Sequence, residues 1–142
     1  MSDVKNTVTP FQQSMSSESA TSVTDVETRD FAMALATAAD ERKGADIRIL
    51  KVDGVSYIAD YFVVVTSFST AQVRAIARSI SDVAAADFNR HPLRTEGQGD
   101  SNWILQDYGE VIVHIFMPDE RDYYDLEAFW GHAEEIPFQP ES

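Results

Sequence analysis

The sequence of 142 residues contains no cysteine. Disulfide bonds, thiolate metal sites and a cysteine nucleophile are therefore excluded, and the composition is compatible with a reducing compartment. The chain also has no apolar run near the roughly 18 residues that a membrane-spanning helix requires, and its start lacks the charged and apolar segments of a signal peptide. We therefore expect a soluble, cytoplasmic protein.

Basic residues are scarce. The chain has 11 Lys and Arg against 24 Asp and Glu, a formal net charge of -13 at pH 7. From Asp107 to Ser142 ten acidic residues accompany one basic residue, Arg121. Such a surface repels nucleic acid and anionic membranes, and it speeds the encounter with a basic protein. A solvated acidic face without a partner would have the same composition, so charge alone does not distinguish a binding surface from a solvated one.

The length fits one domain, because about 150 residues per domain is the usual expectation. Residues 1–27 are rich in Ser, Thr, Gln and Val without a helical or strand period, which is typical of a disordered leader. We expect the compact domain over residues 28–131. Residues 132–142 contain Pro137 and Pro140 and are predicted to form a flexible acidic tail.

Hydrophobic periodicity in the first half of the domain predicts the order helix, strand, strand, helix. Thr28 or Asp30 is expected to cap a helix of about fourteen residues, with Gly44 as the left-handed residue behind it. A strand is expected over residues 46–52. The run YFVVVT at residues 61–66 predicts a central strand buried on both faces.

A helix that ends at Phe88 is predicted after a capping box formed by Ser69 and Gln72. Residues 92–96 are then expected to be extended, and residues 103–106 and 111–117 to form a hairpin across the turn at 107–110.

Asp119 is expected to cap a last helix, whose apolar stripe comprises Tyr123, Leu126, Phe129 and Trp130 and which ends at Gly131. The pattern as a whole predicts a single α/β domain with a mixed sheet of about five strands and helices packed on it.

The stretch from Glu96 to Trp130 contains no catalytic motif, and aromatic and acidic residues alternate along it. This mixture is typical of a docking surface for something basic and partly apolar, since Trp and Tyr are common binding anchors. Core packing is the alternative for Phe129 and Trp130. His114 is interpreted as a satisfied core histidine rather than a catalytic one, and Arg121 as the helical partner of Asp125.

Two segments, ADIRILKVDGVSYIADYFVVVTSFSTAQVRAIA and RTEGQGDSNWILQDYGEVIVHIFMPDERDYYDLEAFW, resemble the ribosomal silencing factor family, also called Iojap-like or RsfS proteins. The resemblance covers roughly residues 31–130. Its most specific parts are Asp60 to Phe62, Glu96-Gly97, the Trp103 strand, the Asp107-Tyr108-Gly109 turn, and His114 followed by Arg121, Tyr124, Leu126, Glu127 and Trp130. Ser67 departs from the family, in which a glycine is common at this place.

The resemblance implies a protein that binds the large ribosomal subunit through large-subunit ribosomal protein number fourteen. Bound there, it would prevent the small subunit from joining and so lower translation when nutrients are short. The resemblance and the apolar last helix also leave a homodimer open. The contact candidates, with the rings as anchors and the carboxylates as charge partners, are Trp103, Leu105, Asp107, Tyr108, Tyr124, Glu127 and Trp130. Tyr108, at the tip of a turn, is expected to be exposed.

The family's fold is similar to that of nucleotidyltransferases, which hold divalent metal ions with a Gly-Ser loop and two carboxylates on a following strand. Ser67-Phe68-Ser69 lacks the glycine and no such carboxylate pair follows, so we expect the topology without the catalysis. His91, His114 and His132 lack the spacing of zinc ligands, and no phosphate-binding loop is present. No cofactor or metal is expected. The open alternative is an acidic adaptor for another basic protein.

Overall fold

The computed structural model describes residues 14–54 and 58–140. The elements in chain order are α1 (Ser14–Glu41), β2 (Ala45–Lys51), β3 (Tyr61–Thr66), α2 (Thr70–Phe88), β4 (Arg94–Glu96), β5 (Trp103–Asp107), β6 (Val111–Phe116), α3 (Pro118–Tyr124), α4 (Leu126–Phe129) and β7 (Glu134–Ile136). The predicted order of helices and strands is confirmed as far as α3. The structure adds α4 and β7.

The strands form one six-stranded sheet in the order β4-β5-β6-β3-β2-β7. Among the strands of the described residues, β3 and β6 alone run parallel and the other neighbours are antiparallel, so the sheet is mixed as predicted. β3 is buried along its whole length, and so is β6 beside it. The continuous apolar run therefore marked a central strand correctly, because a strand covered on both faces has no polar side.

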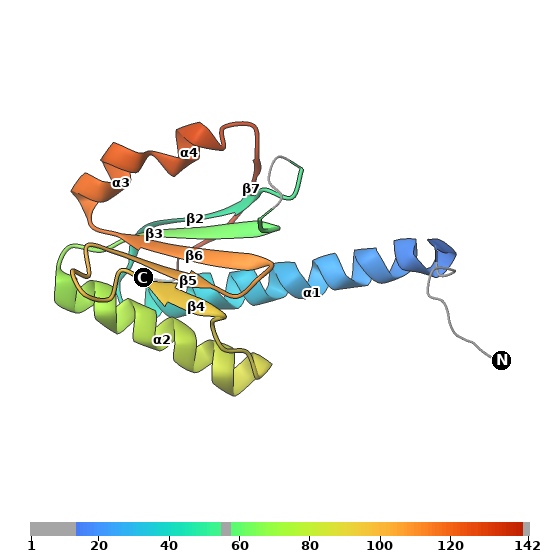
Figure 1. Ribbon diagram of the computed structural model, residues 1–142, viewed down its shortest axis with the longest axis horizontal. Helices are drawn as coiled ribbons and strands as arrows, with labels where there is room; N and C mark the ends of the chain where they lie inside the picture. The colour runs from blue at the N-terminus through green and yellow to red at the C-terminus, as the bar shows by residue number, and fades with distance from the viewer. Residues whose placement is uncertain (1–13, 55–57, 141–142) are drawn as a thin grey trace.

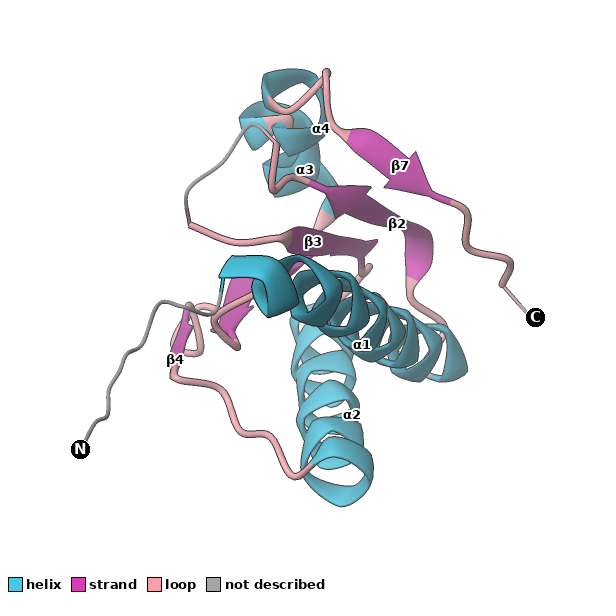
Figure 2. Ribbon diagram, turned by 90° about the vertical axis from the view of Figure 1, so that its right-hand side faces the viewer, coloured by secondary structure: helices cyan, strands magenta, loops and turns pink. Residues whose placement is uncertain are grey.

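Helices cover both faces of the sheet (Figure 1). α1 and α2 lie together on one face, where they pack on the larger core, and α3 and α4 lie on the opposite face, which we call the outer face (Figures 1 and 2). A second, smaller cluster fills the outer face; its buried members are Leu50, Val52, Ala59, Phe62, Val64, Ile112 and Phe116. The alternation of side chains along each strand separates the two clusters.

The capping box at the start of α2 is present. Gln72 N donates to Ser69 Oγ at 3.0 Å, while the side chain of Gln72 accepts from the backbone N of Phe68 at 2.9 Å. The first bond satisfies one of the donors that the first turn of a helix leaves unpaired, and the second ties the residue before the cap to that turn.

The start and end of α1 differ from the prediction. α1 begins at Ser14, so the expected disordered leader is wrong for residues 14–27, whereas residues 1–13 lie outside the described part of the chain. No Gly or Pro stands between residues 11 and 43, and an established helix gains one hydrogen bond for each residue it adds. At the other end Lys43 takes the left-handed conformation, with φ 67. Gly44 is needed for space instead, because an added Cβ would lie 2.7 Å from Val65.

The C-terminal region differs more. Met117 rather than Asp119 is the N-cap of α3, and the single predicted helix is broken at Asp125, whose φ is 45. The predicted tail is also wrong for residues 134–136, because β7 pairs with β2 and Ile136 is buried in the larger core. A strand of three residues is too short to show an alternating pattern in the sequence. β7 is recognised only in the tertiary structure, where it pairs with the edge of β2.

Candidate docking surface on the outer face

Trp103 lies in an aromatic cluster on the outer face. The register places it opposite Phe116, and their ring centroids are 4.7 Å apart. The ring of Tyr124, at the end of α3, lies 4.5 Å from the indole. Aromatic pairs of this kind contribute about 0.5–1.5 kcal/mol beyond the area they bury. The half-buried indole is thus held between β6 and α3 while part of it still meets solvent.

A hydrogen bond fixes the orientation of the indole. Trp103 Nε1 donates to His114 Nδ1 at 3.2 Å, so the imidazole carries its proton on Nε2. Burial lowers the pKa of His114 to about 4, which keeps the ring neutral at neutral pH. His114 is buried, as predicted, but Nε2 has no hydrogen-bond partner among the described residues, so the histidine is satisfied at one nitrogen only.

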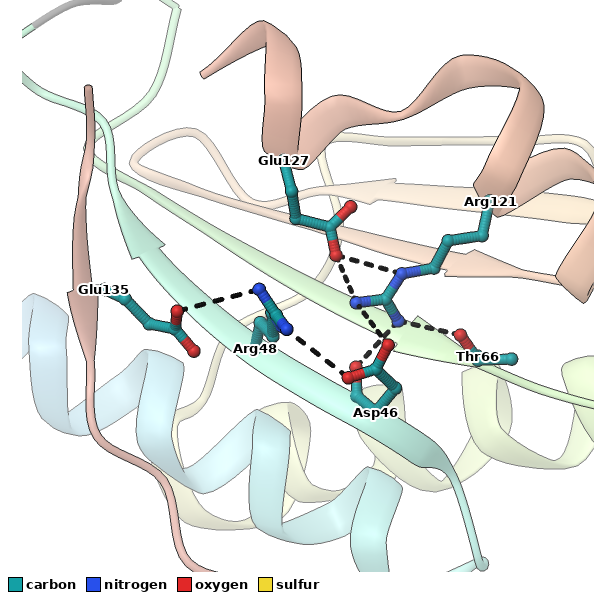
Figure 3. A network of polar contacts seen from close by, with 6 residues as sticks. All are labelled: Asp46, Arg48, Thr66, Arg121, Glu127 and Glu135. Atoms are coloured by element: carbon teal, nitrogen blue, oxygen red, sulfur yellow. Dashed lines mark hydrogen bonds and ion pairs between the residues drawn. The ribbon is translucent and has the colours of Figure 1, made fainter. Parts of the chain in front are cut away.

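Arg121 fastens α3 and α4 over the sheet (Figure 3). Its Nη1 donates to the Asp46 carbonyl at 2.7 Å and to Thr66 Oγ1 at 2.8 Å, and its Nε donates to Glu127 Oε2 at 3.0 Å. The guanidinium is buried, so these contacts replace its hydration. The predicted pairing of Arg121 with Asp125 is wrong; the carboxylates that it pairs with are those of Glu127 on α4 and of Asp46 on β2, the latter at 3.5 Å.

Tyr108 is buried, although the sequence predicted an exposed residue. It is 1% exposed, and its hydroxyl donates to Gln106 Oε1 at 3.0 Å. Its ring packs edge-on against Phe31 of α1 at 5.3 Å, and burial raises the pKa of its hydroxyl. The expectation of an exposed ring at the turn fails because the alternation of β5 continues through the turn and directs this side chain into the larger core.

The other predicted contact residues fall into two groups. Asp107 and Glu127 are engaged within the chain, since Asp107 accepts from Gly109 N at 2.8 Å and pairs with Arg94 at 3.2 Å, and Glu127 holds Arg121. The remaining contact candidates belong to the cluster on the outer face: Trp103, Leu105, Tyr124 and Trp130. Tyr124 is exposed and the other three are half-buried. Trp130 packs on Phe62, with ring centroids 5.6 Å apart, and is half-buried. The alternative prediction of core packing for Trp130 is therefore partly confirmed.

A shallow cleft beside Tyr124 combines aromatic and acidic groups. Asp119, Glu120, Tyr123 and Tyr124 line about 350 Å³ of space. Tyr123 is 81% exposed, and its ring lies 5.0 Å from that of Tyr124. The sequence placed Tyr123 on the apolar stripe of a continuous helix, whereas in the structure its ring is exposed to solvent and α3 ends at Tyr124. The docking surface defined by this geometry comprises Trp103, Leu105, Asp119, Glu120, Tyr123 and Tyr124.

Within residues 14–54 and 58–140 no group of three or more His, Cys, Asp or Glu side chains is arranged to hold a metal ion. No helix in the same ranges has the length and apolar composition needed to cross a membrane.

Comparisons with known proteins identify relatives. Residues 25–142 match the family model described as "Ribosomal silencing factor during starvation", RsfS. The chain is 44% identical over 99 residues to "Ribosomal silencing factor RsfS" of Bacillus subtilis, covering 69% of this chain and 82% of the relative. It is 40% identical over 116 residues to "Protein Iojap, chloroplastic" of Zea mays, covering 80% of this chain but only 50% of the relative, so it spans half the length of that protein. A crystal structure of a Chromobacterium violaceum protein superposes with a TM-score of 0.69 at 30% identity, over 80% of this chain and 95% of that one.

Proposed function

We propose a function from one established premise: the chain belongs to the ribosomal silencing factor family. We infer that it binds the large ribosomal subunit through the basic ribosomal protein number fourteen and thereby blocks association with the small subunit. Translation would fall accordingly when nutrients are short. The one observation that carries the proposal is the docking surface, in which exposed rings and unpaired carboxylates lie on the same side of the sheet.

The chemistry of the docking surface fits a basic partner. Tyr123 and Tyr124 offer ring faces to which a lysine or arginine side chain is attracted, and Asp119 and Glu120 supply negative charge beside them. Among the described residues neither carboxylate forms an ion pair within the chain, whereas Glu127 and Asp107 are already neutralised by arginines. Complementary charge of this kind raises the rate of encounter with a basic protein.

A steric mechanism requires no catalytic group. A protein that occupies a surface also needed by the small subunit shifts the subunit equilibrium by mass action, in proportion to its concentration relative to its dissociation constant. The rigidity of the surface favours this mode of action, because Arg121 and the Trp103–His114 hydrogen bond hold the rings in place before binding.

Sedimentation of mixed ribosomal subunits, with and without the protein, tests the proposal. Near-stoichiometric protein should bind the large subunit and deplete joined ribosomes. Trp103→Ala should weaken large-subunit binding by about 2 kcal/mol or more, the usual scale for an anchor residue. Phe68→Ala is the matched control, because Phe68 is also an exposed aromatic residue, 62% accessible, but lies before α2.

Trp103 is half-buried, so its loss could also disturb the fold. Tyr123→Ala removes an almost fully exposed ring and should weaken binding while leaving the free energy of unfolding unchanged. Normal co-sedimentation of both Trp103→Ala and Tyr123→Ala would show that the docking surface is misplaced. Recovery of a different basic protein, with no large subunits bound, would favour the adaptor alternative.

A further inference from the structure

A second cleft lies on the opposite side of the sheet from the docking surface, between α2 and the β4–β5 edge. Its volume is about 380 Å³, within the range of roughly 300–1,000 Å³ typical of small-molecule sites. Apolar walls and polar groups are both present. It is lined by residues of α2, among them Arg74, Ala77 and Arg78, and by residues of β4 and β5, among them Thr95, Ile104 and Gln106.

Among the described residues no carboxylate lines this cleft, although the sequence contains 24 of them. The pleat of the sheet explains why. Thr95 is paired with Gln106 and points toward α2, whereas the neighbouring Glu96 and Asp107 point to the outer face and are paired there with Arg94. By contrast, four other clefts in the described part of the chain each contain at least two acidic side chains.

The two arginines keep their charge available. Arg74 Nη1 donates to Ser101 Oγ at 3.1 Å, and that hydroxyl donates to the Gln98 carbonyl at 3.0 Å. Ser101 is fully buried, so it holds the guanidinium in place without neutralising it. Arg78 lies one turn further along α2, on the same side of the helix, and has no carboxylate partner among the residues that the structure describes.

We propose that this cleft binds a small phosphorylated ligand of nucleotide size. Two guanidinium groups one helical turn apart can hold a phosphate by charge-assisted hydrogen bonds. Ser81, Thr95 and Gln98 supply further polar groups, and Ala77, Pro92 and Ile104 supply an apolar wall for the rest of the molecule. A nucleic-acid strand carries the same phosphate chemistry, but a chain with a net charge of -13 repels a long polyanion more strongly than a single phosphate.

Calorimetric titration of the full chain at low salt tests the proposal, with adenosine and guanosine 5′-monophosphates, inorganic phosphate and unphosphorylated adenosine as probes. A monophosphate should bind and adenosine should not. Arg74→Gln/Arg78→Gln should weaken the binding by about tenfold or more, because charge-assisted hydrogen bonds are lost. The matched control, Arg42→Gln/Lys43→Gln, removes the same charge from two exposed residues after α1 and should leave the affinity within about threefold of wild type, the usual limit for screened surface charges.

Two results would overturn the proposal: no binding of either monophosphate, or equal binding by the two double variants. Tighter binding of a short RNA than of a monophosphate, at equal phosphate concentration and through the same arginines, would overturn the choice of a small ligand. Large-subunit sedimentation separates this inference from the function proposed above. Arg74→Gln/Arg78→Gln should bind subunits as wild type does, and a loss there would mean that the cleft belongs to the docking surface.

Discussion

Replacing Arg121 with methionine removes the group that joins α3 and α4 to the sheet. The guanidinium side chain is 7% exposed and contacts Glu127, the Asp46 carbonyl and Thr66 (Figure 3). Breaking a buried ion pair by removing one partner typically costs about 3–5 kcal/mol. Because the side chain of Glu127 is 21% exposed and can partly regain water, we expect the lower end, a loss of about 3 kcal/mol in the free energy of unfolding.

Urea unfolding followed by tryptophan fluorescence measures this loss, and both tryptophans lie on the outer face near the perturbed helices. Arg48→Met is the matched control. Arg48 pairs with Asp46 at 3.5 Å and with Glu135 at 3.8 Å, but its side chain is 42% exposed. Its loss should therefore cost about 0–1 kcal/mol, as for other surface ion pairs.

A double-mutant cycle identifies the source of the loss. Glu127→Gln in the Arg121→Met background removes the unpaired carboxylate, so the two substitutions should be less than additive, with a coupling of about 0.5–3 kcal/mol. If Arg121→Met costs no more than Arg48→Met, or if the cycle shows no coupling, the view that this arginine fastens the two helices is refuted.

Two further perturbations test the surroundings of Trp103. His114 has a pKa of about 4 in the folded protein against about 6.5 when unfolded, so only the unfolded state binds a proton between these values. The contribution of His114 to the free energy of unfolding should therefore be constant above pH 6.5. It should fall by up to about 1.4 kcal/mol per pH unit as the pH drops toward 4. His114→Phe should reduce that slope in urea titrations and the exposed control His132→Gln should not; an unchanged slope in His114→Phe would contradict the assignment. Gly97 and Gly109 both have positive φ, so alanine at either position should add about 1–3 kcal/mol of backbone strain. Gly97→Ala should destabilise the protein more, because only there would the new Cβ meet backbone, 1.9 Å from the Trp103 carbonyl oxygen. Equal thermal denaturation midpoints for the two variants would contradict that ranking.

The sequence was informative where a residue's state depends on its near neighbours. The run YFVVVT identified β3 because a strand buried on both faces needs apolar residues at every position. Ser69 and Gln72 identified the start of α2 because a cap forms within four residues of chain. The motifs from Trp103 to Trp130 pointed to the family, which the match over residues 25–142 bears out.

The tertiary structure decided which of the aromatic and acidic residues are available to a partner. Tyr108 was predicted to be exposed at the tip of a turn, but Phe31 of α1 covers its ring. Glu127 was predicted to be available to a partner, but it binds the guanidinium of Arg121, whose other contacts lie on β2 and β3. β7 likewise forms only because β2 offers an unpaired edge. Local patterns record helix and strand period, whereas burial and ion pairing join residues distant in the sequence, and no local pattern contains that information.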